Sequence, residues 1–274
     1  MQVTTSYPQT RPGARRWQAL GQWLADRRSL LTVLLSLFTG FAIWEVVAQL
    51  IVRDKLFLVA PSGIVIRFGE LWRTGEIQGH MLVSGLEFFI GFAAAGVVGV
   101  FVGLIMGTNA PVRAALTPWV SAIYATPLVA LAPLLILWFG LGLMSKVVVV
   151  FGVAVFPVLV NTQTGIESAD EGLLETARAF GARYRQIFTK VLLPAALPFI
   201  VAGLRLGIGR GLVGVVVGEL FGARAGVGFL ITVSSQIFDM GALFAAAMIL
   251  AIAGVVSTEA IRLIERRIAP WRWV

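Results

Sequence analysis

The chain has 274 residues, of which 58% are hydrophobic and only 13% are charged, and its mean hydropathy is +0.89. Soluble domains carry about 25% charged residues, so this composition excludes an ordinary water-soluble fold and indicates a membrane protein. The sequence has no cysteine, which excludes disulfides and thiolate chemistry. It has one histidine, His80, which we interpret as a water-facing interfacial side chain, and we expect no metal site.

Six segments are long and apolar enough to span a bilayer, which requires about 20 residues. They are residues 30–51, 82–106, 115–138, 146–163, 195–218 and 240–262. The sequence therefore predicts an all-α, polytopic protein with a transmembrane core over 80–265. The remaining segments are a basic tail (1–29), an outer loop (52–79), a charged cytoplasmic segment (164–194) and a second tail (266–274).

The outer loop contains "PSGIVIRFGELW", whose spacing predicts a short amphipathic helix at the membrane interface. The third and fourth spans are interrupted by prolines, which buried membrane helices tolerate when neighbouring groups satisfy the freed backbone. These prolines mark either bends used during opening or static packing kinks. They are Pro118, Pro127, Pro133 and Pro157.

The formal net charge of +8 could suggest nucleic acid, but the location of the basic residues argues for membrane topology. With both termini in the cytoplasm, the cytoplasmic segments hold 14 of the 22 Lys and Arg residues and the outer segments hold six. This bias is the one that orients membrane proteins. No nucleic-acid-binding module is visible, so we expect membrane lipid and protein partners only.

Glycines recur at four-residue spacing in the second and fifth spans. Such spacing lets helix backbones approach closely in a membrane. The sequence therefore predicts that these two helices are central, either within the subunit or at a dimer interface. The glycines are Gly99, Gly103 and Gly107 in the second span, and Gly203, Gly207 and Gly211 in the fifth.

The charged segment between the fourth and fifth spans has the pattern of ordered helices. Ser168 and Glu171 form a predicted capping box, and Gly181 can supply a bend between two short helices. An apolar stripe runs along the segment and faces either anionic lipid or a protein partner. Its residues are Leu173, Ala177, Phe180, Tyr184, Ile187, Phe188 and Val191.

The order of residues in "ETARAFGARYRQIFTKVLLP" resembles the signature cytoplasmic loop of the permease subunits of ATP-binding-cassette (ABC) importers. The resemblance implies a type I importer permease fold, with this loop as the coupling helix that docks into a groove of an ATPase. Thr176 stands where the family usually has a second alanine. The residues carried over as the ATPase-coupling surface are Glu175, Thr176, Ala177, Arg178, Phe180, Gly181, Leu193 and Pro194.

The chain itself lacks the phosphate-binding sequence of an ATPase, because "GLGLMSK" has no glycine directly before its lysine. We therefore expect no enzymatic activity and no cofactor in this chain, with ATP and Mg²⁺ on a separate polypeptide. The resemblance implies two ATPase subunits, an extracytoplasmic binding protein and a bacterial inner (plasma) membrane location. One six-span core per chain, without an internal repeat, predicts a second permease copy related by a two-fold axis.

The stretch from Pro133 to Thr162 and the stretch after the loop resemble the branch that imports nitrate, sulfonates, taurine and related molecules. The chain departs from this branch at Leu212, where sulfonate-type members often carry tryptophan, and at Glu87, which replaces a common basic residue. A small anion is the first substrate hypothesis. A neutral vitamin precursor such as a pyrimidine is the alternative.

Two arginines of the fifth span are candidates for the translocation path. An arginine at a helix centre costs about 2.5 to 3.5 kcal/mol on insertion scales, so it must face water or a partner. Arg205 could attract an anion, or could pair with Glu45, Glu87 or Glu259. Arg210 lies about 140° further around the helix. Glu219, at the outer end of the span, could gate the path or contact the binding protein, or could simply be a solvated span end.

Two other classes of protein compete with the permease interpretation. An ATP-independent transporter would normally show inverted repeats, and none is visible. A membrane scaffold would use the charged segment only as a lipid-facing helix.

Overall fold

The computed structural model describes residues 31–52, 54 and 56–268, which are helical apart from short connections. The chain divides into two compact units, Met1–Gly63 and Ile64–Val274. The predicted tail 1–29, and residues 269–274 of the predicted tail 266–274, lie outside the described residues. Among the described residues, five helices are long and apolar enough to cross a membrane, and a bent helix pair supplies a sixth candidate span. The predicted all-α membrane fold is confirmed.

The first unit contains one apolar helix, Leu31–Val52, whose last six residues (Val47–Val52, η1) have π-helical geometry. The Glu45 carboxylate accepts hydrogen bonds from the backbone N–H of Ser62 at 3.0 Å and from its hydroxyl at 2.6 Å. Gln49 donates to the same carboxylate. Glu45 therefore ties this helix to the start of α2 (Pro61–Arg73) and is not the partner of Arg205.

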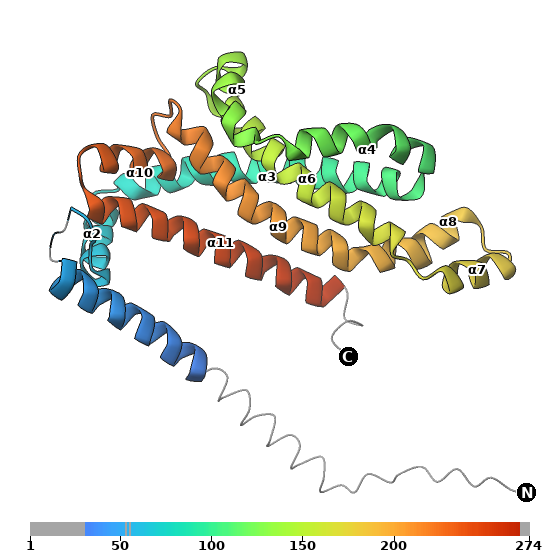
Figure 1. Ribbon diagram of the computed structural model, residues 1–274, viewed down its shortest axis with the longest axis horizontal. Helices are drawn as coiled ribbons and strands as arrows, with labels where there is room; N and C mark the ends of the chain where they lie inside the picture. Colours follow the sequence, from blue (N-terminus) through green and yellow to red (C-terminus); the bar gives the residue numbers. More distant parts are fainter. Residues whose placement is uncertain (1–30, 53, 55, 269–274) are drawn as a thin grey trace, which may run out of the picture. The chain divides into compact units, whose positions relative to one another are not determined.

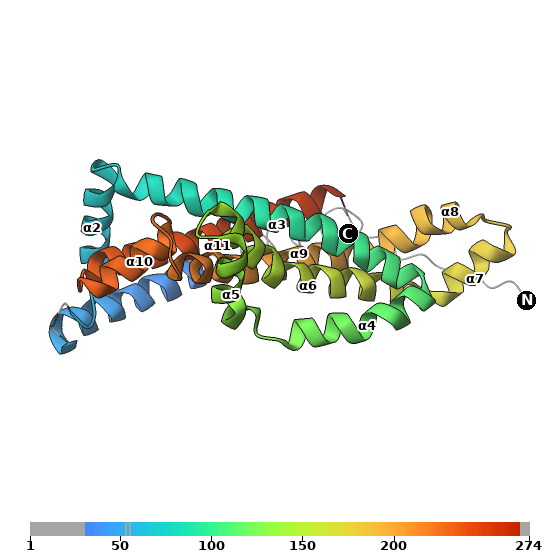
Figure 2. The same ribbon diagram turned by 90° about the horizontal axis from the view of Figure 1, so that it is seen from above.

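Three long helices form the centre of the second unit: α3 (Glu76–Thr108), α6 (Leu143–Glu167) and α9 (Leu193–Leu220). They run side by side, with α6 packed against both of the others (Figures 1 and 2). More than half of the α6 span, 56%, is buried, against 28% for the α3 span. The prediction that the second and fifth spans are central was therefore incomplete, because the fourth span lies between them.

The glycines of α3 allow this packing. A Cβ atom added at Gly103 would lie 2.6 Å from the Leu159 carbonyl oxygen of α6, and one added at Gly107 would lie 2.6 Å from the Ile166 Cβ. On α9, a Cβ atom at Gly203 would lie 3.0 Å from the Pro157 carbonyl oxygen. Contacts below 3.0 Å are not available to real side chains, so the close approach of α3 and α6 within one subunit requires glycine there.

The predicted third span is a broken helix. Its first part, α4 (Ala110–Ala125), begins at the Asn109 side chain, which accepts a hydrogen bond from the Val112 N–H at 3.2 Å. The chain then bends by 75° before η2 (Leu128–Leu131) and α5 (Ala132–Phe139). Pro127 stands at the break, whereas Pro118 lies within α4 and Pro133 in the first turn of α5.

The charged segment forms two short helices, α7 (Glu171–Ala179) and α8 (Tyr184–Ile187), and η3 (Phe188–Leu192) leads from α8 into α9. Both views place α7 and α8 at one end of the second unit, away from α10 (Val227–Gln236) at the other (Figures 1 and 2). The predicted capping box is wrong. Asp170 caps α7 by accepting from the Leu173 N–H at 3.2 Å, because Ser168 still ends α6, where its hydroxyl donates to the Gly165 carbonyl.

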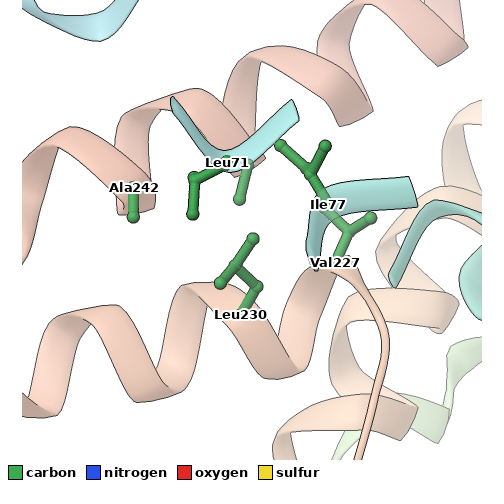
Figure 3. Packing of buried hydrophobic residues seen from close by; sticks show 6 residues of the cluster. Leu71, Ile77, Val227, Leu230 and Ala242 are labelled. Atoms are coloured by element: carbon green, nitrogen blue, oxygen red, sulfur yellow. The ribbon is translucent and has the colours of Figure 1, made fainter. Parts of the chain in front are cut away.

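The predicted interfacial helix is present as α2, and its apolar face packs on protein. Leu71 of α2 and Ile77 of α3 meet Val227 and Leu230 of α10 and Ala242 of α11 (Met240–Ile268), as Figure 3 shows. Each of these five side chains is at most 5% exposed. This cluster holds the α10 end of the second unit together.

Candidate coupling surface and translocation path

The α7–α8 tip presents apolar side chains outward. Phe180 is 88% exposed, Tyr184 66% and Leu173 59%. The predicted apolar stripe is therefore divided: its first part faces outward, whereas Ile187 is buried beside a hollow of about 340 Å³ that Val191 also lines. An exposed phenylalanine at a projecting tip is typical of a side chain that inserts into a partner.

The bend between α7 and α8 depends on Gly181, as predicted. Its φ of 71° lies in the left-handed region, which glycine adopts without steric cost. The Gly181 N–H donates to the Arg178 carbonyl at 2.9 Å, and the Ala182 N–H donates to the Ala177 carbonyl at 3.0 Å. These bonds close the end of α7 and leave Phe180 at the turn.

An ion pair that the sequence did not predict lies at the base of the tip. Arg113 of α4 donates to Glu167, the last residue of α6, at 2.6 Å. The pair borders a hollow of about 1290 Å³ that Glu171 and Arg178 of α7 also line. Arg113 and Glu167 are 54 positions apart in the sequence. No local sequence pattern indicates that their side chains pair.

Arg205 is engaged in a pair with Glu265 of α11, at 3.0 Å. The interpretation as a structural pair is supported, but each of the three expected partners, Glu45, Glu87 and Glu259, is wrong. Glu265 is 3% exposed and the Arg205 side chain is 41% exposed, so the pair joins α9 to α11 at the edge of the packed interior. Glu265 lies beyond the predicted end of the sixth span, so the sequence does not indicate it as a partner for an arginine within the membrane.

Arg210 lies in a different environment on the same helix. It lines a hollow of about 330 Å³ beside the break between α4 and η2. Within the described part of the chain, no carboxylate lies within 4.0 Å of its guanidinium. The structure therefore separates the two arginines, with Arg205 paired and Arg210 facing a cavity.

Glu219 is buried rather than solvated, with 1% of its surface exposed, so the expectation of a solvated span end is wrong. Its carboxylate accepts hydrogen bonds from the Ser84 hydroxyl and the Gly228 N–H, each at 2.5 Å, and from the Phe229 N–H at 3.3 Å. It therefore satisfies backbone N–H groups in the first turn of α10. Gly226 is required here, because a Cβ atom would lie 2.2 Å from the Glu219 Cδ.

Other polar groups complete this buried cluster at the α10 end. Lys146 is 5% exposed and donates from Nζ to the carbonyls of Leu141 at 2.7 Å and Gly142 at 3.2 Å. Glu87 is 2% exposed. His80 is half-buried and its Nδ1 accepts from the Gly226 N–H at 2.9 Å, so this histidine faces the protein rather than water.

The described residues contain no group of three or more His, Cys, Asp or Glu side chains placed to hold a metal ion. The arrangement is instead that of a membrane-spanning bundle with a projecting apolar tip and a cationic hollow within the span. Residues 96–270 match the model of the binding-protein-dependent transport system inner membrane component. The chain belongs to this family. It is the permease component of an ABC importer, and it is not itself catalytic.

Individual relatives differ in the solutes they are named for. The chain is 37% identical over 231 residues, 84% of each chain, to a putative aliphatic sulfonates transport permease of Bacillus subtilis. It is 34% identical to a formylaminopyrimidine transport permease of Halalkalibacterium halodurans, over 84% of this chain and 91% of that one. It is 28% identical to the taurine transport system permease of Escherichia coli, over 91% of this chain and 92% of that one.

Solved structures share the fold. An amino acid ABC transporter with histidines superposes with a TM-score of 0.60 at 18% identity, over 73% of this chain and 97% of that one. An inward-facing methionine ABC transporter superposes with a TM-score of 0.56 at 23% identity, over 71% of this chain and 94% of that one. Family membership implies a multi-pass inner membrane protein that works with an ATPase and a binding protein.

Proposed function

We propose that this chain forms the translocation path for a small organic anion, with a second copy across a two-fold axis. Two ATPase subunits carry ATP and Mg²⁺ on the cytoplasmic side, and an extracytoplasmic binding protein delivers the solute. Both termini lie in the cytoplasm. The observation that carries the proposal is the α7–α8 tip, where Phe180 is 88% exposed at the end of a helical bundle.

The tip is connected to the membrane span by continuous helix. Tyr184–Leu220 runs unbroken for 37 residues, through α8, η3 and α9, and contains Leu193 and Pro194 of the family signature. At 1.5 Å per residue it is about 55 Å long. A displacement imposed on the tip by an ATPase is therefore transmitted along one rod to the depth of Arg210.

The remaining signature residues lie on α7 and its C-terminal turn. Glu175 and Arg178 are exposed, carry opposite charges and lie five and two residues before Phe180. We assign Phe180 as the anchor that enters the ATPase groove, with Glu175, Thr176 and Arg178 as its polar surroundings. Ala177 and Gly181 keep the turn short.

The anionic substrate class rests on Arg210 and on the relatives named for sulfonates and taurine, which are 37% and 28% identical to this chain. A neutral heterocycle is the second candidate, because a relative named for formylaminopyrimidine is 34% identical. Arg210 favours the anion, since an unpaired guanidinium gains most from a negatively charged solute.

The test is co-purification of the cognate ATPase with the permease in mild detergent. We expect Phe180→Ser to weaken association by about 30-fold or more, since buried aromatic anchors commonly contribute 2 kcal/mol or more. Phe57→Ser is the matched control, because Phe57 is 76% exposed and lies outside the tip. Equal ATPase recovery from the Phe180 and Phe57 variants would overturn the assignment of the tip.

A further inference from the structure

The hollow beside Arg210 lies at the middle depth of the span. Arg210 is ten residues before the end of α9 at Leu220, about 15 Å along the helix axis. The hydrocarbon core is about 30 Å thick. The hollow is formed where α4 ends and the chain bends by 75°, between that break, α6 and α9.

One wall of the hollow is cationic and the rest is mainly apolar. Arg210 is the only charged residue among its described lining residues, and none of these is Asp or Glu. The apolar wall includes Val153, Phe156 and Val213. The Phe156 ring is stacked on Tyr124, with centroids 5.7 Å apart, which fixes both rings at the side of the hollow.

Arg210 is the only cationic donor among the described residues that line the hollow. The Thr126 hydroxyl donates to the Ala122 carbonyl at 2.9 Å, so its proton is already used. Arg210 has no carboxylate within 4.0 Å among the described residues. A guanidinium at this depth is costly unless it meets water or an anion, and its planar donors match the oxygens of a sulfonate or carboxylate.

We propose that this hollow is the membrane-depth binding site for the solute, and that it selects a monoanion with a short apolar body and no ammonium group. A simple alkanesulfonate satisfies both walls, because its headgroup meets Arg210 and its alkyl chain covers Val153 and Val213. The volume of about 330 Å³ lies at the lower end for ligand pockets and is large enough for a short alkanesulfonate.

Two related solutes fit less well. Nitrate has no apolar surface, so it would lose hydration against the apolar wall without a hydrophobic gain. Taurine carries an ammonium group in addition to its sulfonate, and no acidic side chain among the described lining residues can receive it. The proposal rests on the proposed function, because it assigns the chemistry of the same path.

The absence of cysteine from the chain allows a direct test. Val213→Cys places a single thiol in the hollow, where Val213 is 51% exposed. The permease–ATPase complex in lipid nanodiscs is treated with sulfonate-bearing, trimethylammonium-bearing and neutral methanethiosulfonates, and labelling of this chain is followed by mass. We expect the ratio of the anionic to the cationic labelling rate to be about tenfold higher with Arg210 in place than in the Arg210→Gln variant. This is the effect expected of one nearby charge in a partly shielded site.

Matched variants distinguish an effect of the Arg210 charge from an effect on folding. Arg210→Lys should keep most of the ratio of anionic to cationic labelling rates. Arg224→Gln, which removes a cation outside the hollow, should leave it unchanged. Ethanesulfonate should slow the neutral reagent at lower concentration than taurine or nitrate, and this protection should be lost in Arg210→Gln.

Four results would overturn the proposal: a ratio that does not depend on Arg210, protection by nitrate or by taurine equal to that by ethanesulfonate, protection that persists in Arg210→Gln, or a thiol that no reagent reaches. The labelling needs neither ATP hydrolysis nor transport. Loss of ATPase association would therefore contradict the proposed function and leave the labelling ratio readable on the permease alone.

Discussion

Arg205 and Arg210 of α9 show which properties of a single residue the sequence can predict and which depend on packing. Composition and insertion energetics indicate that Arg205 and Arg210 cannot both face lipid, and their 140° separation places them on different faces. The sequence could not identify Glu265 as the partner of Arg205, because the two residues are 60 positions apart and meet only when α9 packs on α11. The cavity at Arg210 likewise depends on the 75° bend at Pro127, whose angle no local pattern specifies.

Asp239, just before α11, gives a prediction with a definite pH dependence. Asp239 accepts from the Ala242 N–H at 3.0 Å, at the first turn of α11, and from Arg67 of α2 at 2.7 Å. Burial alone would raise the pKa of Asp239, but the Ala242 N–H and the Arg67 guanidinium outweigh it and lower the pKa below its ordinary value. Asp239 therefore stabilises the folded state in its ionised form.

We expect Asp239→Asn to keep the cap and lose the ion pair, and Asp239→Ala to lose both, at a further cost of about 1 kcal/mol. The stabilisation of wild type over Asp239→Asn should be fully present above the unfolded-state pKa of about 3.9 and should shrink as the pH falls below it. Thermal unfolding followed by tryptophan fluorescence, from pH 7 to pH 3, measures both effects. A wild-type advantage that does not change with pH would argue against the ionic role of Asp239.

At the scale of elements, glycine spacing identified the close contacts but not the helix at their centre. The glycines at regular four-residue spacing lie on α3 and α9, so the sequence indicates these two helices. Their common partner α6 contributes branched side chains to the contacts, and a branched apolar helix has no distinctive packing signature. The partners on α6 include Val158, Thr162 and Ile166.

Two glycines of α3 provide an element-scale prediction. A Cβ atom at Gly103 would lie 2.6 Å from the Leu159 carbonyl oxygen, whereas one at Gly85 would meet no atom within 4 Å. We expect Gly103→Ala to destabilise the protein by about 1 to 3 kcal/mol through forced separation of α3 and α6. Gly85→Ala should be neutral or stabilising by up to about 1 kcal/mol, because alanine favours helix.

The apparent melting temperature of each variant in detergent checks this pair of predictions. Opposite signs for the two substitutions are the expected result. If both variants melt like wild type, the close approach of α3 and α6 does not limit stability.

For the whole molecule, the sequence predicted an all-α membrane fold and the family, and both are confirmed. These predictions were possible because the six apolar segments and the signature loop are each defined by residues that are neighbours in the sequence. The break in the third span and the buried polar cluster around Glu219 are consequences of packing between distant segments. In the sequence Glu219 could be a solvated span end, yet Glu219, Lys146 and Glu87 are each at most 5% exposed.

In the proposed function, force transmission and solute recognition lie on one rod, Tyr184–Leu220, with Phe180 just before its start and Arg210 along it. An ATPase that acts on the α7–α8 tip would drive a solute past the span. Transport by the intact transporter tests this coupling.

The most direct measurement is ATP-dependent uptake of labelled ethanesulfonate by proteoliposomes that contain the permease, its cognate ATPase and its binding protein. We expect uptake that requires ATP and the binding protein and that falls at least tenfold in Phe180→Ser. Phe57→Ser should transport like wild type. Uptake that continues without ATP, or that is unaffected by Phe180→Ser, would contradict the account.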